Sequence, residues 1–205
     1  LRANLEKEGV SFRSHSDTEV LLYALARWGR AALPRLNGIF AFALYDKKER
    51  TLLCARDPVG VKPFYFSRIN EGIAFGSEVR AVLHLNGSRP SINRRAIPSY
   101  LSFLWTSSDE TIFDGVQRLA PGHSITVRDG TVNIERYIDL AEFFGEPERI
   151  GGYGSDISTT ARRIHDAFRD AVRRQMVSDV PVGVFLSGGL DSTAILHFMD
   201  DALRS

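Results

Sequence analysis

The segment Gly38-Ile-Phe-Ala-Phe-Ala-Leu-Tyr-Asp46 constrains the fold of this 205-residue chain more than any other stretch. It is apolar at nearly every position, whereas a strand with one wet face alternates apolar and polar residues. A continuous apolar strand of this kind is covered on both faces. The sequence therefore predicts that the sheet containing this strand lies inside a layered α+β domain.

A helix is predicted just before this strand. Ser16-Asp-Thr-Glu19 has the pattern of a capping box, in which Ser16 accepts a bond from a first-turn N–H and Glu19 reaches back to the cap residue. The apolar residues that follow recur at helical spacing, and the helix is expected to end near Gly29.

Short strands are predicted after it. Thr51 to Ala55 is interpreted as the strand that returns from Gly38–Asp46, and residues 63–67 and 72–76 give two more. We expect these strands to form one antiparallel meander. Ser77 is then expected to cap a short helix.

The second half of the chain predicts a hairpin, a linker and a change of architecture. Asp129-Gly130, inside the segment 124–134, is a strong signal for a tight hairpin turn. Residues 145–157 have the composition of a linker, so a domain boundary is placed there. A helix is expected over 158–177, followed by a short strand at Val182–Leu186 and a last helix from Ser192.

The loop Ser187-Gly-Gly-Leu-Asp-Ser192, between that strand and that helix, carries the clearest chemical signal. Gly188 and Gly189 allow the backbone to approach an anion closely. The hydroxyl groups of Ser187 and Ser192 add donors, and the helix supplies the positive end of its dipole. Asp191 would repel a bare phosphate, which suggests a bridging Mg²⁺.

This loop is neither a Walker A loop nor a GxGxxG fingerprint. It resembles the SGGxDS pyrophosphate loop of ATP pyrophosphatases. The alternative interpretation is purely structural, with a Gly-Gly turn that ends a strand and Ser192 as an ordinary helix cap.

Charge and cysteine content exclude several classes of function. A formal net charge of +1 gives no electrostatic reason to expect nucleic acid or an anionic membrane. No apolar run approaches the roughly 20 residues that span a bilayer. The one cysteine, Cys54, allows no intrachain disulfide, so a reducing, cytoplasmic location is expected. Its apolar neighbours predict a small buried hydrophobe rather than a nucleophile.

Several motifs together resemble one family. Asn37–Asp46, Arg56-Asp-Pro-Val-Gly-Val-Lys-Pro-Phe-Tyr65 and Phe75-Gly-Ser-Glu78 resemble strand motifs of class II glutamine amidotransferases. Ser178–Ser192 is similar to the entry motif of the synthetase domain in asparagine synthetases, and Thr111–His123 matches the bacterial members. The chain is therefore identified as a member of the asparagine synthetase superfamily, with the motifs in family order.

The resemblance implies an architecture in two parts. Residues 1–145 would form a four-layer αββα Ntn-type glutaminase sandwich whose N-terminal part is missing. Residues 146–157 would be a linker. Residues 158–205 would be the first strand–loop–helix of a parallel-sheet α/β ATP-pyrophosphatase domain.

The resemblance also implies an activity for the full-length protein. Glutamine would supply ammonia, and aspartate with ATP and Mg²⁺ would form β-aspartyl-AMP, which ammonia converts to asparagine. The substrates are thus glutamine, aspartate and ATP, with no nucleic acid or membrane partner. A homodimer is one assembly that the resemblance leaves open for the full-length protein.

Individual residues carry over from the family motifs. Asp17 matches the carboxylate that binds the glutamine ammonium group, although it also suits a first-turn acid that complements the helix dipole. The nucleophilic cysteine is expected upstream of Leu1, so no catalytic residue is assigned within the chain. Lys62 and Glu78 match motif positions and are given no role. The residues matched to ATP and pyrophosphate binding are Phe185, Ser187, Gly188, Gly189, Asp191 and Ser192, with Asp191 also matched to the metal.

Two other interpretations are left open. One is an asparagine-synthetase-like amidotransferase that acts on another carboxylate, because the acceptor pocket would lie outside this sequence. The other is an inactive, truncated chain that serves only as a fold or binding module. Binding of ATP with Mg²⁺, together with glutamine hydrolysis, distinguishes these interpretations from an active asparagine synthetase.

Overall fold

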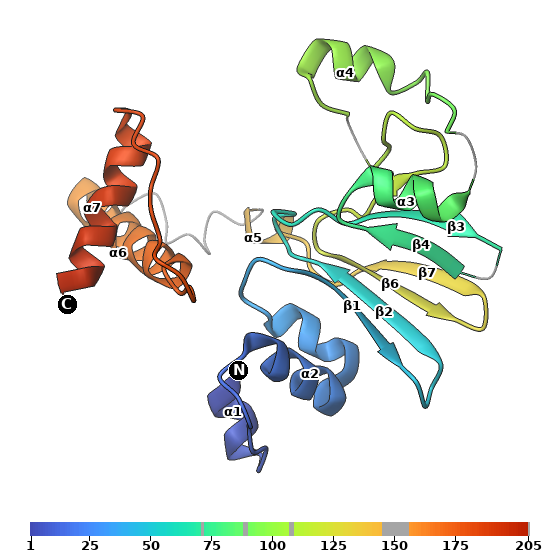
Figure 1. The fold of residues 1–205 in the computed structure, drawn as a ribbon. Helices are drawn as coiled ribbons and strands as arrows, with labels where there is room; N and C mark the ends of the chain where they lie inside the picture. Colours follow the sequence, from blue (N-terminus) through green and yellow to red (C-terminus); the bar gives the residue numbers. More distant parts are fainter. Residues whose placement is uncertain (71, 88–89, 107–108, 145–155, 205) are drawn as a thin grey trace. The chain divides into compact units, whose positions relative to one another are not determined.

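The computed structural model describes residues 1–70, 72–87, 90–106, 109–144 and 156–204 (Figure 1). The chain forms two compact units, Leu1–Phe143 and Phe144–Ser205. The expected linker, residues 146–157, lies almost entirely outside the described residues.

Four layers of secondary structure make up unit 1, in the order helices, sheet, sheet, helix. One sheet has the strand order β1-β2-β6-β7 and the other has the order β4-β3-β5. The first helical layer consists of α1 (Arg2–Lys7), α2 (Asp17–Trp28) and the 3-10 helix η1 (Gly29–Arg35). The first sheet consists of β1 (Ala41–Asp46), β2 (Thr51–Arg56), β6 (His123–Arg128) and β7 (Thr131–Arg136). The second sheet consists of β3 (Tyr65–Ile69), β4 (Gly72–Gly76) and β5 (Gln117–Arg118), and α3 (Val79–Asn86) covers it.

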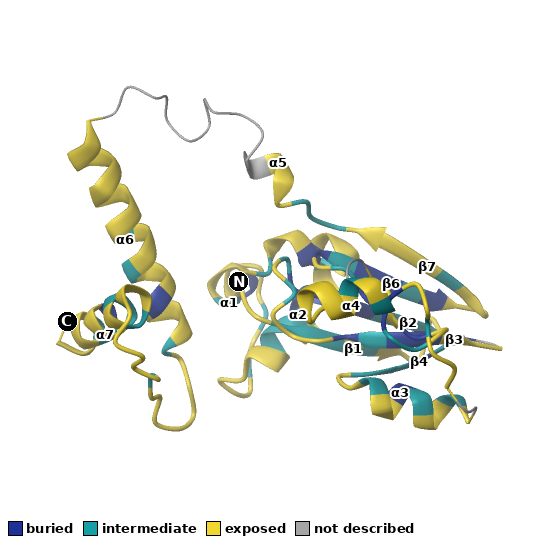
Figure 2. Ribbon diagram, turned by 90° about the horizontal axis from the view of Figure 1, so that it is seen from above, coloured by how far each residue is buried: buried dark blue, intermediate teal, exposed yellow. Residues whose placement is uncertain are grey.

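The core is divided between these layers. Leu25 of α2 and Leu33 of η1 pack against Ala55 of β2, which joins the helices to the first sheet. Between the sheets, Ile125 of β6 meets Phe66 of β3. A third cluster fixes α3 on the second sheet. Figure 2 shows buried residues gathered in β2 and β6, where both faces of the sheet are covered.

The single meander expected from the sequence is wrong. β1 and β2 form one antiparallel hairpin and β3 and β4 form another, but the two hairpins belong to different sheets. The chain crosses from one sheet to the other between Arg56 and Tyr65, and β6 takes the place beside β2. A pattern of short strands separated by turns does not say which sheet each strand joins.

The strand expected at Gly38–Asp46 begins only at Ala41, and its double covering is incomplete. Phe42 and Leu44 pack against the helical layer. On the other face Ala43 and Tyr45 are exposed. The reason is the position of β1, which lies at the edge of its sheet.

The hairpin predicted at Asp129-Gly130 is confirmed. β6 and β7 pair in register from His123 with Arg136 to Arg128 with Thr131. Asp129 and Gly130 have φ values of 47° and 75°, the left-handed conformation that a tight two-residue turn requires. By contrast, the predicted Ser77 cap is wrong, because α3 begins after Glu78 with no side-chain capping bond.

Between α3 and β5, α4 (Ile97–Phe103) extends away from the sheets (Figure 1). It leaves the side chains of Leu101 and Phe103 largely exposed. The short helix α5 (Ala141–Phe144) follows β7.

Unit 2 contains two packed helices, α6 (Ile157–Gln175) and α7 (Leu190–Arg204). Phe198 of α7 is buried and meets Phe168 of α6 edge to face, with ring centroids 5.1 Å apart. The expected strand at Val182–Leu186 is absent from the described residues of this unit. A parallel strand forms only beside a partner strand, and the described part of unit 2 offers none.

Candidate functional site

The N-terminus of α2 places Asp17, the residue matched to glutamine binding. Ser16 is the helix cap, and its Oγ accepts a hydrogen bond from the Thr18 N–H at 3.2 Å. Asp17 follows as the first helical residue, with its carboxylate exposed. The sequence thus predicted this half of the capping box correctly.

The other half of the capping box is wrong. Glu19 does not reach Ser16; its carboxylate accepts from the N–H groups of Arg13 and Ser14 at 2.9 and 2.8 Å, and from Ser14 Oγ at 2.6 Å. These bonds, first the one from the Ser14 hydroxyl, lower the pKa of Glu19. Glu19 therefore holds the segment Arg13–Ser14 against the first turn of α2 and does not bond to the cap residue. These bonds fix the backbone that leads to Asp17.

Asp17 borders a cavity of about 820 Å³ within unit 1. The walls come from the N-terminal residues, the start of α2, the chain that enters β1, and the crossover between the sheets. Lys62, to which the sequence analysis gave no role, and Ser77, which it expected to cap a helix, line the same cavity. The lining residues also include Arg2, His15, Asn37, Gly38, Phe40 and Pro63.

The crossover behind this cavity is held by a buried arginine. The Arg56 guanidinium donates to three carbonyl oxygens, those of Lys62, Gly60 and Leu119, at 2.6–2.7 Å. The Arg56 carbonyl in turn accepts from the Tyr137 hydroxyl at 2.6 Å. These bonds tie the crossover to two later segments of the chain.

Asp57, only 1% exposed, holds the turn that follows. Its carboxylate accepts from the N–H groups of Val59, Val61 and Lys62 at 3.0–3.2 Å. Gly60 completes this turn with φ of 73°, and a Cβ there would lie 2.8 Å from Pro121. The Arg-Asp-Pro-Val-Gly motif is therefore a structural support that fixes the backbone of Lys62.

Cys54 lies between the two sheets with no exposed surface. Burial raises the pKa of its thiol to about 12, so the thiolate is not formed at neutral pH. The prediction of a small buried hydrophobe is confirmed.

The loop Ser187–Ser192 folds compactly at the start of α7. Gly188 adopts φ of 79°, which favours glycine. Ser187 Oγ and Ser192 Oγ lie 3.0 Å apart, and Ser192 Oγ also donates to the Gly189 carbonyl at 3.1 Å. The two hydroxyl groups are thus brought to one side of the turn.

α7 begins at Leu190, two residues before the expected start at Ser192. Asp191 and Ser192 therefore lie in the first helical turn, and Ser192 is not a helix cap. The first N–H groups of a helix have no intrahelical partner. These donors and the exposed Asp191 carboxylate suit an anion that carries a hard cation.

The predicted residues fall into two separate places. Asp17 belongs to unit 1, whereas Ser187, Gly188, Gly189, Asp191 and Ser192 form one loop of unit 2. Phe185 precedes this loop with a fully exposed side chain.

The described residues also contain two absences, which concern metal ions and membranes. Within these residues no group of three or more His, Cys, Asp or Glu side chains is arranged to hold a metal ion. The helices in the same part of the chain include none that is long and apolar enough to cross a bilayer.

The layered fold and the sequence motifs define the class of this protein. The family described as glutamine amidotransferase domain matches residues 1–138, and the family described as asparagine synthase matches residues 163–205. The chain therefore belongs to the glutamine amidotransferase domain family, with a segment of asparagine synthase sequence after it. The resemblance drawn from the sequence motifs is confirmed.

Individual relatives are glutamine-hydrolysing asparagine synthetases. The chain is 38% identical to asparagine synthetase 3 of Bacillus subtilis over 95% of its length and 31% of that protein. It is 36% identical to asparagine synthetase 1 of the same organism, over 96% of its length and 30% of that protein. The chain thus spans about a third of the length of these relatives.

One solved structure to which the chain is similar is that of glutamine phosphoribosylpyrophosphate amidotransferase from B. subtilis, in complex with ADP and GMP. The TM-score is 0.48 and the sequence identity is 17%, over 99% of this chain and 41% of that one.

Proposed function

We propose that this chain is part of a glutamine-dependent asparagine synthetase. The observation that carries the proposal is the succession, in one chain, of a glutamine amidotransferase region with Asp17 at its cavity and an asparagine synthase segment with the Ser187–Ser192 loop. In the full-length protein the first region would release ammonia from glutamine. The second would use ATP to activate aspartate.

The domain limits follow from this proposal. Residues 1–145 would belong to the glutaminase domain and residues 146–157 to a linker. Residues 158–205 would open the ATP-pyrophosphatase domain, whose parallel sheet would supply the partner that Val182–Leu186 needs to become a strand.

Asp17 would bind the α-ammonium group of glutamine. Its carboxylate is exposed and borders the cavity at the first residue of α2. The cavity volume of about 820 Å³ lies within the usual range for small-molecule sites. Cys54 takes no part, because its thiol is buried and protonated.

The loop would bind the phosphates of ATP. Gly188 gives the backbone its close approach, and the hydroxyl groups of Ser187 and Ser192 face one side. Asp191 would hold Mg²⁺, which neutralises phosphate charge when bound. The backbone near Phe185 would contact the adenine.

Two substitutions in the full-length enzyme test this proposal. Asp191→Asn should abolish ATP-dependent synthesis and pyrophosphate release, and it should leave glutamine hydrolysis largely intact. Asp200→Asn, on the same helix but far from the loop, is the matched control and should keep both activities. Unchanged pyrophosphate release by Asp191→Asn at saturating Mg²⁺ contradicts the assignment.

Asp17→Asn should instead raise the KM for glutamine, with ammonia-dependent synthesis unaffected. A charge-assisted hydrogen bond contributes about 1.5–3 kcal/mol, so the KM should rise roughly tenfold or more. If glutamine use does not change, the cavity beside Asp17 is not the glutamine site.

A further inference from the structure

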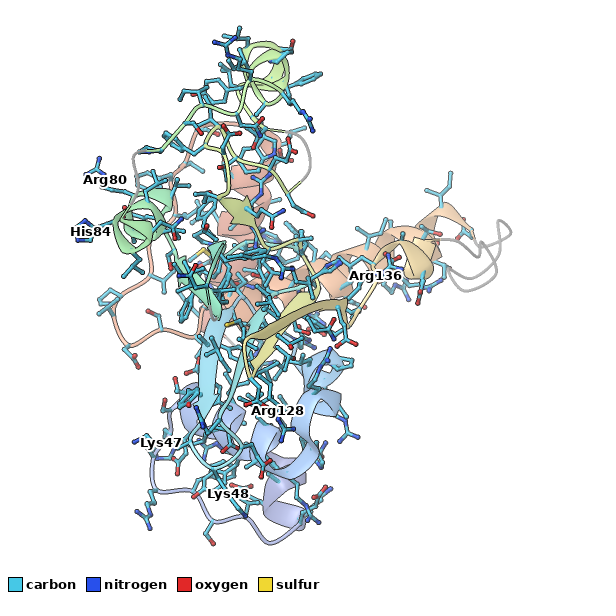
Figure 3. All side chains as sticks on the ribbon, turned by 90° about the vertical axis from the view of Figure 1, so that its right-hand side faces the viewer. Lys47, Lys48, Arg80, His84, Arg128 and Arg136 are labelled. Atoms are coloured by element: carbon cyan, nitrogen blue, oxygen red, sulfur yellow. The ribbon has the colours of Figure 1, made fainter. Side chains whose placement is uncertain are left out.

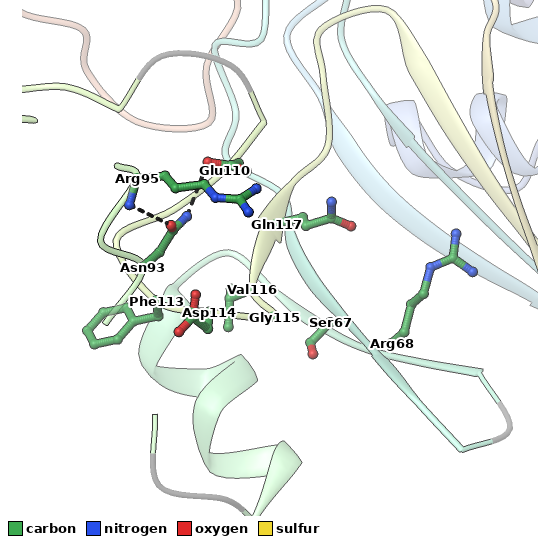
Figure 4. Close-up of a pocket in the computed structure, with 10 residues that line it drawn as sticks. All are labelled: Ser67, Arg68, Asn93, Arg95, Glu110, Phe113, Asp114, Gly115, Val116 and Gln117. Atoms are coloured by element: carbon green, nitrogen blue, oxygen red, sulfur yellow. Dashed lines mark hydrogen bonds between the residues drawn. The ribbon is translucent and has the colours of Figure 1, made fainter. Parts of the chain in front are cut away.

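Unit 1 contains a second cavity, of about 550 Å³, that shares no lining residue with the one beside Asp17 (Figure 4). It forms where β5 leaves the second sheet. β5 pairs with Tyr65 and Phe66 of β3 and forms a bridge from Gln117 to Glu110, and the chain before it turns away from β3 at Gly115, with φ of 75°. Space therefore opens beside the part of β3 that follows Phe66.

One wall of this cavity presents unpaired donors. Gln117 pairs with Phe66, and Arg68 lies two residues further along β3, so both side chains project from the same face of the sheet. Arg95 adds a second guanidinium to the lining of the cavity (Figure 4). Among the described residues, none of these three side-chain ends has a hydrogen bond or ion pair.

Two carboxylates border the same space and are fixed in place. Asn93 Nδ2 donates to Glu110 Oε2 at 3.2 Å, and Asn93 Oδ1 accepts from the Arg95 N–H at 3.1 Å (Figure 4). Ser91 Oγ donates to Asp114 Oδ2 at 2.7 Å. Asn93 thus sets the positions of an acid and of the Arg95 backbone together.

The charges of the walls define the ligand. Two guanidinium groups favour two carboxylates, which they bind with paired hydrogen bonds. Glu110 and Asp114 would repel a simple dianion such as phosphate, and they favour a ligand that also carries a cation. Phe113, which is partly exposed, adds apolar surface for a short carbon chain.

We propose that this cavity binds an acidic α-amino acid, with its two carboxylates at Arg68 and Arg95 and its ammonium group at Glu110. The site is separate from the one assigned to glutamine, and the inference does not depend on the proposed function. The volume of about 550 Å³ also lies within the range of small-molecule pockets.

Calorimetric titration of the chain with L-aspartate, L-glutamate, succinate and inorganic phosphate tests this proposal. The two amino acids should bind saturably. Succinate, which lacks the ammonium group, should bind more weakly, and phosphate more weakly still. The absence of saturable binding by either amino acid, or phosphate binding more tightly than both, overturns the inference.

Substitutions locate the site. Arg95→Gln and Arg68→Gln should each weaken aspartate and glutamate binding about tenfold or more, because each removes a charge-assisted bond. Arg80→Gln is the matched control, since Arg80 extends from α3 away from the cavity (Figure 3) and should leave the affinity unchanged. Asp17→Asn should also have no effect on this affinity.

A last variant tests the acidic wall. Glu110→Gln should reduce the preference for aspartate over succinate, because the ligand ammonium group loses its partner. Thermal melting confirms that each variant is folded before titration. Equal affinities in the parent chain and in both arginine variants contradict the proposal.

Discussion

The two units of this chain differ in how firmly their sequence motifs are held. In unit 1 the Arg56–Asp57 motif is buried and bonded to segments on both sides of the sandwich. In unit 2 the Ser187–Ser192 loop is largely exposed, and the buried residues among those described are Val172 and Phe198. A clear sequence motif therefore does not indicate a stable local structure. The Ser187–Ser192 motif consists of residues suited to phosphate binding, whereas the Arg56–Asp57 motif consists of residues that hold the crossover in place.

The largest expected difference is in amide hydrogen exchange. Among the described residues, the segment between Met176 and Gly189 has no backbone–backbone hydrogen bond, whereas β2 is paired on both sides. The protection factors of the backbone amides in β2 should exceed those at 178–187 by at least about a thousandfold. Limited proteolysis should also cut 178–187 first. Equal protection of the two segments in a demonstrated monomer contradicts this contrast.

Removal of the buried carboxylate should have the next largest effect. Asp57→Ala removes a buried carboxylate that accepts from three backbone N–H groups of the crossover turn, which should lower the free energy of unfolding of unit 1 by about 3 kcal/mol or more.

The matched control is Asp46→Ala. Asp46 also accepts from two backbone N–H groups, those of Lys48 and Glu49, but in an exposed turn where water replaces the acceptor. Its loss should cost less than about 1 kcal/mol. Urea denaturation of both variants measures the difference, and equal destabilisation shows that burial of the crossover is unimportant.

Within unit 2, Phe198 should be the dominant contact. Phe198→Ala removes the ring that meets Phe168 and His165, which should cost about 3 kcal/mol and separate α7 from α6. Helical circular dichroism should fall while the melting of unit 1 is unchanged. Leu203→Ala, at an exposed position of α7, is the control and should have little effect. If both variants behave alike, packing by Phe198 does not hold the helix pair.

The smallest expected effect is a pH dependence in unit 1. Burial raises the pKa of Cys54 from 9.0 to about 12, so folding favours the protonated thiol. Its contribution to stability is fully present below pH 9 and is lost as the pH rises towards 12. At pH 10 the loss should be roughly 1 kcal/mol. Comparison of unfolding with that of Cys54→Ala between pH 8 and 11 measures it; identical slopes contradict the assignment.

Local signals in the sequence predicted local structure well. The cap at Ser16, the end of α2 near Gly29 and the turn at Asp129-Gly130 follow from side-chain bonding and φ preferences within a few residues. The shape of the Ser187–Ser192 loop likewise depends on its own glycines and hydroxyl groups.

What the sequence did not predict depends on distant partners. The change of sheet after Arg56 rests on contacts with Leu119 and Tyr137, which no periodicity reveals. The strand at Val182–Leu186 was expected from composition alone, although pairing requires a second strand. Lys62 was assigned no role, because its position beside the Asp17 cavity depends on the bond from its backbone N–H to the Asp57 carboxylate, which the sequence does not reveal.

The bonds made by Arg56 also set an order of events during synthesis. Its guanidinium reaches Leu119, 63 residues later, and its carbonyl accepts from Tyr137, 81 residues later. Both bonds close long loops, whose entropy must be lost before the contact is gained. A ribosome adding 5–20 residues per second makes Tyr137 roughly 4–16 s after Arg56. For that interval Arg56 has only its local partners, Gly60 and Lys62, and the first sheet is completed only when the β6–β7 hairpin arrives.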